Sequence, residues 1–252
     1  MIFDSHAHYN DEAFDSDADE LLSSMQDSNV HYIMNACSSL KEMDRILELC
    51  EKYSGFYASV GIHPESACKW SGEIEAAMIH YAKNPKVRAI GEIGLDYYWD
   101  TVSSDIQKEC FDCQLSLAEQ LNMPVIIHDR EAHKDSLDTV KAHKGLKGVF
   151  HCFSGSREMA ADVLDLGYYI AFGGSLTFKN NVKTVEVAKY VPLERIVVET
   201  DCPYLTPVPF RGKRNSSLYV HYVIEKLAEL KGISPQEVED ITCRNAKELF
   251  NI

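Results

Sequence analysis

A regular alternation of short apolar runs with amphipathic segments constrains the fold of this chain more than any other feature. The runs are rich in Val, Ile and Phe, and eight of them occur, at residues 2–8, 30–37, 56–64, 87–96, 124–130, 148–155, 168–174 and 195–201. Segments with helical spacing, such as 40–53 and 106–121, lie between them. Apolar strands that alternate with helices are typical of a parallel sheet covered on both faces. Eight such units predict an α/β fold, a TIM-type (β/α)8 barrel.

The length and composition agree with one barrel. The chain has 252 residues, of which 45% are hydrophobic, so it can bury one sizeable core, and we expect residues 1–252 to form a single domain. A doubly wound open sheet is the alternative. Residues 234–250 begin with the Ser-Pro-x-Glu pattern of a capped helix, which we expect to pack on the outside of the domain.

No targeting or membrane-spanning segment is recognisable in the sequence. The first residues lack the order of a signal peptide, and no window approaches the roughly 20 apolar residues that span a bilayer. We therefore expect a cytoplasmic protein without a membrane partner. Among the eight cysteines, Cys110 and Cys113 form a CxxC pair inside a helical pattern, so reduced, half-buried thiols are expected.

Side chains that can bind metal ions stand near the ends of most predicted strands. They are His6, His8, His63, Glu92, Asp96, His128, His151, Glu199 and Asp201. Because the carboxyl ends of the strands converge on one mouth of a barrel, we expect these groups to share a small volume. Two residues apart on a strand, His6 and His8 would point to the same side and could meet one cation.

Imidazole nitrogens and carboxylate oxygens suit Zn, Mn, Fe or Ni, and also Mg where water completes its shell. We expect two divalent cations, with no preference for one metal, and six ligands: His6, His8, Glu92, His128, His151 and Asp201. Glu92 would bridge the ions, each of which would have two of the histidines. Asp201 would complete the first ion and accept a proton from water that the cations make more acidic.

Seven motifs resemble, in order and spacing, those of the TatD family of metal-dependent deoxyribonucleases within the amidohydrolase superfamily. They are FDSHAH at 3–8, GIHP at 61–64, GEIGLDYY at 91–98, PVIIHDREA at 124–132, HCFSG at 151–155, ETDCPYL at 199–205 and RGKRN at 211–215. The resemblance covers nearly the whole chain. It implies a β/α barrel with a two-metal mouth, the same six ligands, and hydrolysis of phosphodiester bonds in DNA.

The resemblance also implies roles for residues at the rim of the site. His63 is similar to a family residue near the substrate phosphate, so it is a candidate for both catalysis and substrate binding, beside Glu92 and Asp201 as catalytic residues. Arg130 and Arg211 would face the phosphate. Two departures concern this rim: Glu65 follows GIHP where a histidine is common, and Ser216 and Ser217 follow RGKRN where a proline is common. The second departure is expected to loosen the loop of Arg211.

The net charge of −14 gives no indication of a broad basic face, so we expect an anionic substrate to be held by local contacts. We expect a strand end to enter the mouth, with contacts from a few basic residues: Arg130, Lys179, Arg211, Lys213 and Arg214. Aromatic side chains just past the strand ends could stack on unpaired bases or only pack at the rim: Tyr97, Tyr98, Trp99 and Tyr204. DNA, as single-stranded ends, is the expected partner of a monomeric protein.

The leading hypothesis is a 3′-to-5′ exodeoxyribonuclease that uses a metal-activated water. One alternative is a related hydrolase of a small amide, ester or phosphoester, although many of those enzymes have a modified lysine where this chain has Glu92. Another is a metal-binding protein without turnover, which would need a gap in the ligand set, and none is visible. A covalent mechanism is not expected, because Ser5, Cys152 and Ser154 suit packing and hydrogen bonding to the ligands.

Overall fold

The sheet of this protein consists of parallel strands in chain order. A computed structural model describes residues 1–252 apart from the side chain of Gln26, and in this part of the chain the sheet has eight strands. They are β1 (Ile2–Ala7), β2 (Val30–Asn35), β3 (Phe56–Val60), β4 (Val87–Asp96), β5 (Val125–Arg130), β6 (Gly148–Phe150), β7 (Tyr169–Phe172) and β8 (Ile196–Val198). The predicted (β/α)8 barrel is confirmed, and the open, doubly wound sheet is wrong.

The seam between the last and first strands closes just past the end of β8. Ala7 and Cys202 form a parallel bridge. The N–H of Asp201 donates to the carbonyl of His6 at 2.9 Å, and the N–H of His8 donates to the carbonyl of Cys202 at 2.8 Å. The backbone bonds that close the barrel therefore belong to the residues predicted to bind metal.

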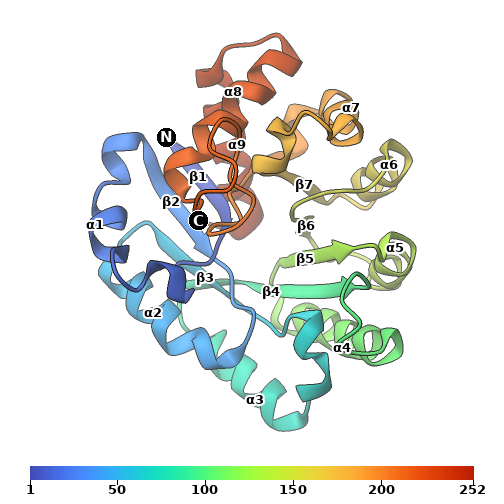
Figure 1. The fold of residues 1–252 in the computed structure, drawn as a ribbon. Helices are drawn as coiled ribbons and strands as arrows, with labels where there is room; N and C mark the ends of the chain where they lie inside the picture. The colour runs from blue at the N-terminus through green and yellow to red at the C-terminus, as the bar shows by residue number, and fades with distance from the viewer.

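Helices surround the strands as an outer ring in Figure 1. They are α1 (Ala18–Ser23), α2 (Met43–Lys52), α3 (Gly72–Tyr81), α4 (Ser104–Leu121), α5 (His133–Ala142), α6 (Arg157–Asp165), α7 (Val182–Tyr190), α8 (Val220–Lys231) and α9 (Pro235–Phe250). α9 begins as predicted, because the Ser234 hydroxyl accepts from the N–H of Glu237 at 3.2 Å and Pro235 takes the first helical position.

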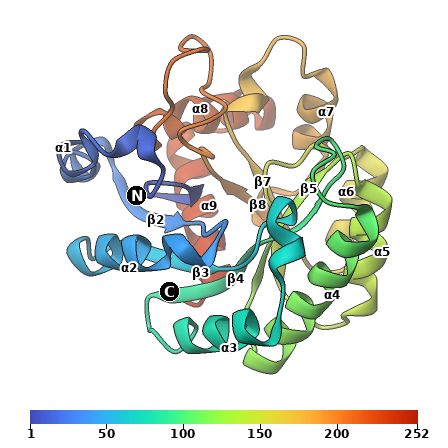
Figure 2. The same cartoon turned by 60° about the horizontal axis from the view of Figure 1, so that its bottom comes forward.

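The terminal helix α9 closes the inside of the barrel as well as covering its wall. One buried cluster joins α9 to side chains from seven of the strands: Phe3, Met34, Ala89, Ile126, Val149, Tyr169, Ala171 and Val197. Side chains from so many strands meet only in a barrel interior. Phe250 enters this cluster, with its ring centroid 5.8 Å from that of Phe3. Figure 2 shows α9 beside α8, and its polar face, which includes Asp240 and Arg244, is exposed, so the helix packs on the outside as expected while its end also closes the barrel.

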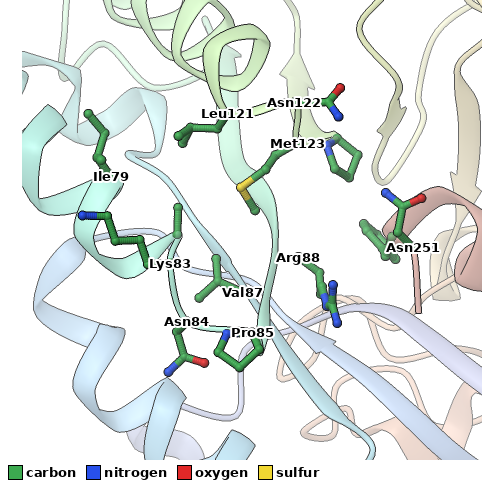
Figure 3. A pocket seen from close by; sticks show the side chains of 13 residues that line it. Ile79, Lys83, Asn84, Pro85, Val87, Arg88, Leu121, Asn122, Met123 and Asn251 are labelled. Atoms are coloured by element: carbon green, nitrogen blue, oxygen red, sulfur yellow. The ribbon is translucent and has the colours of Figure 1, made fainter.

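A hollow of about 300 Å³ lies at the amino ends of the strands. Its lining includes Pro85, just before β4, Pro124, just before β5, and Asn251, just after α9 (Figure 3). In barrels of this class, active sites lie at the opposite, carboxyl ends of the strands. The hollow is thus a feature of the end that α9 closes, remote from the predicted mouth.

Two further features of the sequence can be compared with the structure. All eight cysteines are free among the described residues, in agreement with the expectation of reduced thiols. In the same part of the chain, no helix is both long enough and apolar enough to cross a membrane.

Removing the Phe250 ring tests whether α9 seals the barrel. Phe250→Ala is expected to lower the free energy of unfolding by about 3–5 kcal/mol, because it leaves a cavity against Phe3. Urea denaturation followed by circular dichroism measures this. Val182→Ala is the control, since Val182 is 66% exposed and its truncation should cost about 0.5 kcal/mol or less. Equal effects of the two substitutions would contradict the sealing role.

Candidate metal centre

Glu92, near the end of β4, is the centre of a cluster of imidazoles at the carboxyl ends of the strands. Its Oε1 lies 2.8 Å from Nδ1 of His128 and 2.8 Å from Nε2 of His151. Its Oε2 lies 3.4 Å from Nε2 of His6 and 3.7 Å from Nε2 of His8. Glu92 is only 3% exposed, so both oxygens are committed to these four rings. Each oxygen of Glu92 therefore faces a different pair of histidines.

His6 and His8 converge with Asp201 on the other side of the seam. The two Nε2 atoms are 3.0 Å apart, as expected for alternate residues of one strand that point to the same side. Oδ1 of Asp201 lies 3.4 Å from Nε2 of His8 and 3.7 Å from Nε2 of His6. The structure therefore brings all six predicted metal ligands together.

The donor atoms of this cluster suit divalent cations. Atoms of His6, His8 and Glu92 lie within 4.8 Å of one another, and so do atoms of His63, Glu92 and His128. Glu92 is thus common to two triads of nitrogen and oxygen donors, which is the arrangement that a bridging carboxylate requires. Buried groups of this kind are stable when they are paired or coordinate a metal.

His63 borders the cluster from the loop after β3. Its Nε2 lies 3.8 Å from Oε1 of Glu92, and its ring centroid is 4.6 Å from that of His128. Its Nδ1 accepts a hydrogen bond from the N–H of Glu65 at 3.3 Å. Burial and the neighbouring His128 lower the pKa of His63 to about 3. The ring is therefore neutral with its proton on Nε2, so it presents a hydrogen-bond donor to the site.

The protons of the cluster are unevenly distributed. Burial and His151 lower the pKa of His6 to about 4. Burial alone would lower the pKa of His8, but Asp201 and Glu92 raise it to about 9. In the same way Asp96 and Glu92 overcome burial and raise the pKa of His128 to about 10. Without cations, His8 and His128 therefore carry protons near pH 7 that a metal has to displace.

The carboxylates of the cluster are ionised because the neighbouring histidines stabilise their negative charge. Burial alone would raise the pKa of Glu92, but His151 and His6 hold it well below its usual range. Burial also opposes ionisation of Asp201, yet its hydrogen bond to His8 keeps its pKa below the usual value. The site thus combines two buried anions with several imidazoles, a donor set that fits two divalent cations.

Comparisons with known proteins agree with this geometry. The profile of a family described as TatD-related DNase matches residues 3–251. The chain belongs to this family. Among curated relatives, the uncharacterized metal-dependent hydrolase YabD of Bacillus subtilis is 43% identical over 254 residues, with 100% of both chains covered. The 3′-5′ ssDNA/RNA exonuclease TatD of Klebsiella pneumoniae is 32% identical over 258 residues, which cover 100% of this chain and 98% of that protein.

A solved structure supports the same assignment. The crystal structure of YjjV, a TatD homologue from Escherichia coli K12, matches with a TM-score of 0.93 and 31% sequence identity. The match covers 100% of this chain and 98% of that chain. The protein is therefore a metal-dependent hydrolase of the TatD family, with the barrel that the sequence predicts.

The two arginines predicted to face the phosphate lie on aromatic rings in this TatD-family hydrolase. The guanidinium carbon of Arg130 is 3.7 Å from the ring centroid of Tyr98, and that of Arg211 is 3.9 Å from the ring centroid of Phe178. Among the described residues, no hydrogen bond or ion pair joins either guanidinium to the histidine cluster. Their contact with a phosphate stays a prediction.

The loop after RGKRN is fixed where we expected it to be loose. Ser217 is fully buried, and its hydroxyl donates to Oδ2 of Asp4 at 2.5 Å. Its N–H donates to the Tyr9 hydroxyl at 2.8 Å. The expected loosening is therefore wrong at Ser217, because this serine supplies a buried hydrogen bond that a proline could not.

Two carboxylates lie against the histidine nitrogens that face away from Glu92, and the sequence identified them only as strand-end residues. Oδ2 of Asp96 lies 2.9 Å from Nε2 of His128, on the side away from Glu92. Glu199 lies 3.8 Å from Nδ1 of His151, and its Oε1 accepts from the N–H of Cys152 at 2.6 Å. Such partners fix the orientation and tautomer of ligating histidines. Their place at strand ends was the available signal.

Glu199 lies beside the stacked imidazole rings of His6 and His151. The rings of His6 and His151 lie 4.0 Å apart and nearly parallel, and one nitrogen of each lies within 4.8 Å of a Glu199 carboxylate oxygen. Glu199 is fully buried, and this burial raises its pKa to about 8. Nδ1 of both rings and Oε2 of Glu199 have no hydrogen-bond partner among the described residues. Glu199 is therefore the polar group that these inward-facing nitrogens share.

The uneven protonation predicts that metal affinity rises with pH. Because metal binding requires neutral imidazoles, the protons on His8 and His128 have to leave, so affinity should rise by up to about tenfold per pH unit for each proton displaced. Titration calorimetry with Mn²⁺ between pH 6 and 8, in buffers of different ionisation enthalpy, counts these protons. A pH-independent affinity with no proton release would contradict the assigned protonation.

Replacing the carboxyl group of Glu199 tests its hold on His6 and His151. Glu199→Gln keeps the shape of the side chain but puts an amide, which cannot ionise or exchange a proton with the imidazoles, in place of the carboxyl group, and we expect metal affinity to fall about 10–100-fold. Titration calorimetry with Mn²⁺ measures the change. Glu194→Gln, at an exposed position just before β8, is the matched control and should leave the affinity unchanged. Wild-type affinity in Glu199→Gln would exclude the positioning role.

Proposed function

We propose that this TatD-family hydrolase cleaves phosphodiester bonds in DNA, as a divalent-metal-dependent 3′-to-5′ exodeoxyribonuclease acting on single-stranded ends. The observation that carries the proposal is the position of Glu92, whose Oε2 faces His6 and His8 while its Oε1 contacts His128 and His151. Family membership supports the choice of substrate, because a relative named as a 3′-5′ ssDNA/RNA exonuclease aligns with the whole of this chain.

Six residues would hold two cations: His6, His8, Glu92, His128, His151 and Asp201. Two such cations supply positive charge that neutralises the phosphate, and they lower the pKa of water toward neutrality. The number and spacing of the donors suit this role, since Glu92 contacts histidines on both sides of the mouth. The identity of the cations is a matter for experiment, with Mg, Mn, Zn, Ni and Fe as candidates.

The chain's own groups then position the substrate and handle the proton. Asp201 is ionised and lies beside His6 and His8, so its Oδ1 is placed to accept the proton of an attacking water. His63 presents its Nε2 proton at the border of the cluster, where it can donate to a phosphate oxygen. Asp201 is held by its backbone bond to His6, and His63 by the hydrogen bond from Glu65, which fixes both groups before substrate arrives.

The charge of the protein supports a short contact with a strand end. Duplex binding normally relies on many basic contacts, whereas this chain has 25 basic and 39 acidic residues. Arg214, one of the predicted DNA contacts, instead forms an ion pair with Asp17 at 2.5 Å. Fewer basic side chains are therefore free at the mouth than the sequence indicated, and the cations have to provide much of the positive charge.

Removing one proposed ligand tests the site. His6→Ala is expected to lower kcat/KM on a labelled single-stranded oligonucleotide by about 100–1,000-fold, the usual effect of losing one electrostatic stabiliser of a transition state. Metal content should fall in parallel while the circular dichroism spectrum is unchanged. His80→Ala, an exposed histidine on α3, is the control and should behave as wild type.

The substrate is tested with a panel that covers single- and double-stranded DNA, RNA and small phosphoesters, each with Mg²⁺, Mn²⁺, Zn²⁺ and Ni²⁺. Stepwise shortening of single-stranded DNA from its 3′ end, faster than that of duplex, is expected. Hydrolysis of small phosphoesters or amides with intact oligonucleotides would favour the alternative hydrolase. Tight metal retention without any turnover would contradict an enzymatic role.

A further inference from the structure

Two large aromatic side chains stand exposed directly after the end of β4. Tyr98 is 49% exposed and Trp99 is 48% exposed, and their rings meet edge to face at 4.7 Å between centroids. Exposed aromatic surface of this size is unfavourable in water and commonly marks a binding site. Because β4 also carries Glu92, these rings border the mouth of the barrel.

Arg130, at the end of the neighbouring strand β5, covers the same two rings. Its guanidinium carbon lies 3.7 Å from the Tyr98 centroid and 5.7 Å from the Trp99 centroid. Asp96 and Arg130 are partners in the register of β4 and β5, so the sheet itself holds the cation beside the rings. No ion pair or hydrogen bond engages this guanidinium in the part of the chain that the structure describes, which leaves its N–H groups free for a ligand.

One carboxylate joins this group to the metal centre. Oδ1 of Asp96 accepts from the N–H of Tyr98 at 2.9 Å and from the N–H of Trp99 at 3.3 Å. Oδ2 of the same residue lies 2.9 Å from Nε2 of His128. The backbone that carries the two rings is therefore held in place relative to a proposed metal ligand, as a substrate-binding subsite requires.

The chemistry of the group selects a planar, electron-rich ligand attached to an anion. Every nucleobase has such a face, stacking on aromatic rings tolerates any base, and a guanidinium adds both cation–π attraction and hydrogen bonds to phosphate. A base inside a duplex already stacks on its neighbours, so an aromatic side chain reaches its face readily only when the base is unpaired. Stacking also provides affinity that does not depend on basic charge, which this chain lacks.

We propose that Tyr98, Trp99 and Arg130 form an aromatic platform that binds an unpaired base at the strand end while the adjacent phosphate reaches the metal centre. The inference rests on the proposed nuclease function and specifies how its substrate is held. The platform accounts for a preference for single strands over duplex. It also predicts that binding depends on the terminal base being present but little on which base it is.

Trp99 reports directly on the platform, because Trp70 and Trp99 are the two tryptophans of the chain. In a Trp70→Phe background, the metal-loaded protein is titrated with a single-stranded oligonucleotide whose 3′-terminal phosphorothioate linkages resist hydrolysis. Saturable quenching of the Trp99 fluorescence is expected. The same oligonucleotide with an abasic 3′-terminal nucleotide should quench little and bind about 10-fold more weakly, the usual effect of one stacked base.

A cycle of variants and substrates separates stacking from a general structural role. With fluorescein-labelled oligonucleotides, Trp99→Ala and Tyr98→Ala should each weaken binding about 10-fold, whereas Trp99→Phe should keep most of the affinity. On the abasic oligonucleotide the alanine variants should bind as wild type does, because the missing partner cancels the effect. Tyr190→Ala is the control: Tyr190 is also exposed beneath an arginine, Arg157, but it lies shortly before β8 begins.

The outcomes for the platform and for the nuclease function differ. Base-dependent quenching without hydrolysis of any oligonucleotide would refute the nuclease function and leave the platform standing. Normal hydrolysis with equal binding of abasic and intact ends would overturn the platform alone. Additive losses from Trp99→Ala and from the abasic end would also overturn it, since the ring would then act on something other than the base.

Discussion

The closure of the barrel at one seam is the constraint on which the site depends. Asp4 is fully buried there, and its carboxylate accepts from the N–H of Thr200 at 2.9 Å, the Thr200 hydroxyl at 2.6 Å and the Ser217 hydroxyl at 2.5 Å. β8 is short, so these side-chain bonds continue the pairing that its backbone does not complete. They bring His6 against Asp201, about three quarters of the chain length away, and an open sheet would leave the two at opposite edges.

The interior of the barrel is apolar where α9 closes it. Toward the mouth it is polar, and some of its buried polar atoms have no hydrogen-bond partner among the described residues. Of the six buried side-chain atoms without a partner among the described residues, four belong to Ser5, His6, His151 and Glu199. Unpaired buried groups destabilise a fold and are rare elsewhere in native proteins. Three of these atoms, Nδ1 of His6 and of His151 and Oε2 of Glu199, lie beside the candidate metal centre, so this cost falls at the site while the interior cluster and α9 supply stability.

The sequence predicted the parts of this structure that follow from periodicity. The apolar runs predicted the eight strands. The convergence of parallel strands at one mouth of a barrel then predicted that the histidines at their carboxyl ends lie together. The roles of Asp96 and Glu199 could not be predicted, since they depend on which nitrogen of His128 or His151 faces away from Glu92. The amphipathic pattern of α9 showed that one face is buried, but it could not show that this face fills the barrel.

The fourth and fifth strands combine chemistry with recognition. Glu92 and Asp96 are four residues apart on β4, so they project to the same face of the strand and contact opposite nitrogens of His128 on β5. Tyr98 and Trp99 follow the end of β4, and Arg130 is the last residue of β5. In the proposed complex, a substrate on this platform would be held at a fixed position relative to the metal centre through two adjacent strands. For an acidic protein such positioning would take the place of broad charge attraction, because it would hold a strand end beside the cations that the cluster binds.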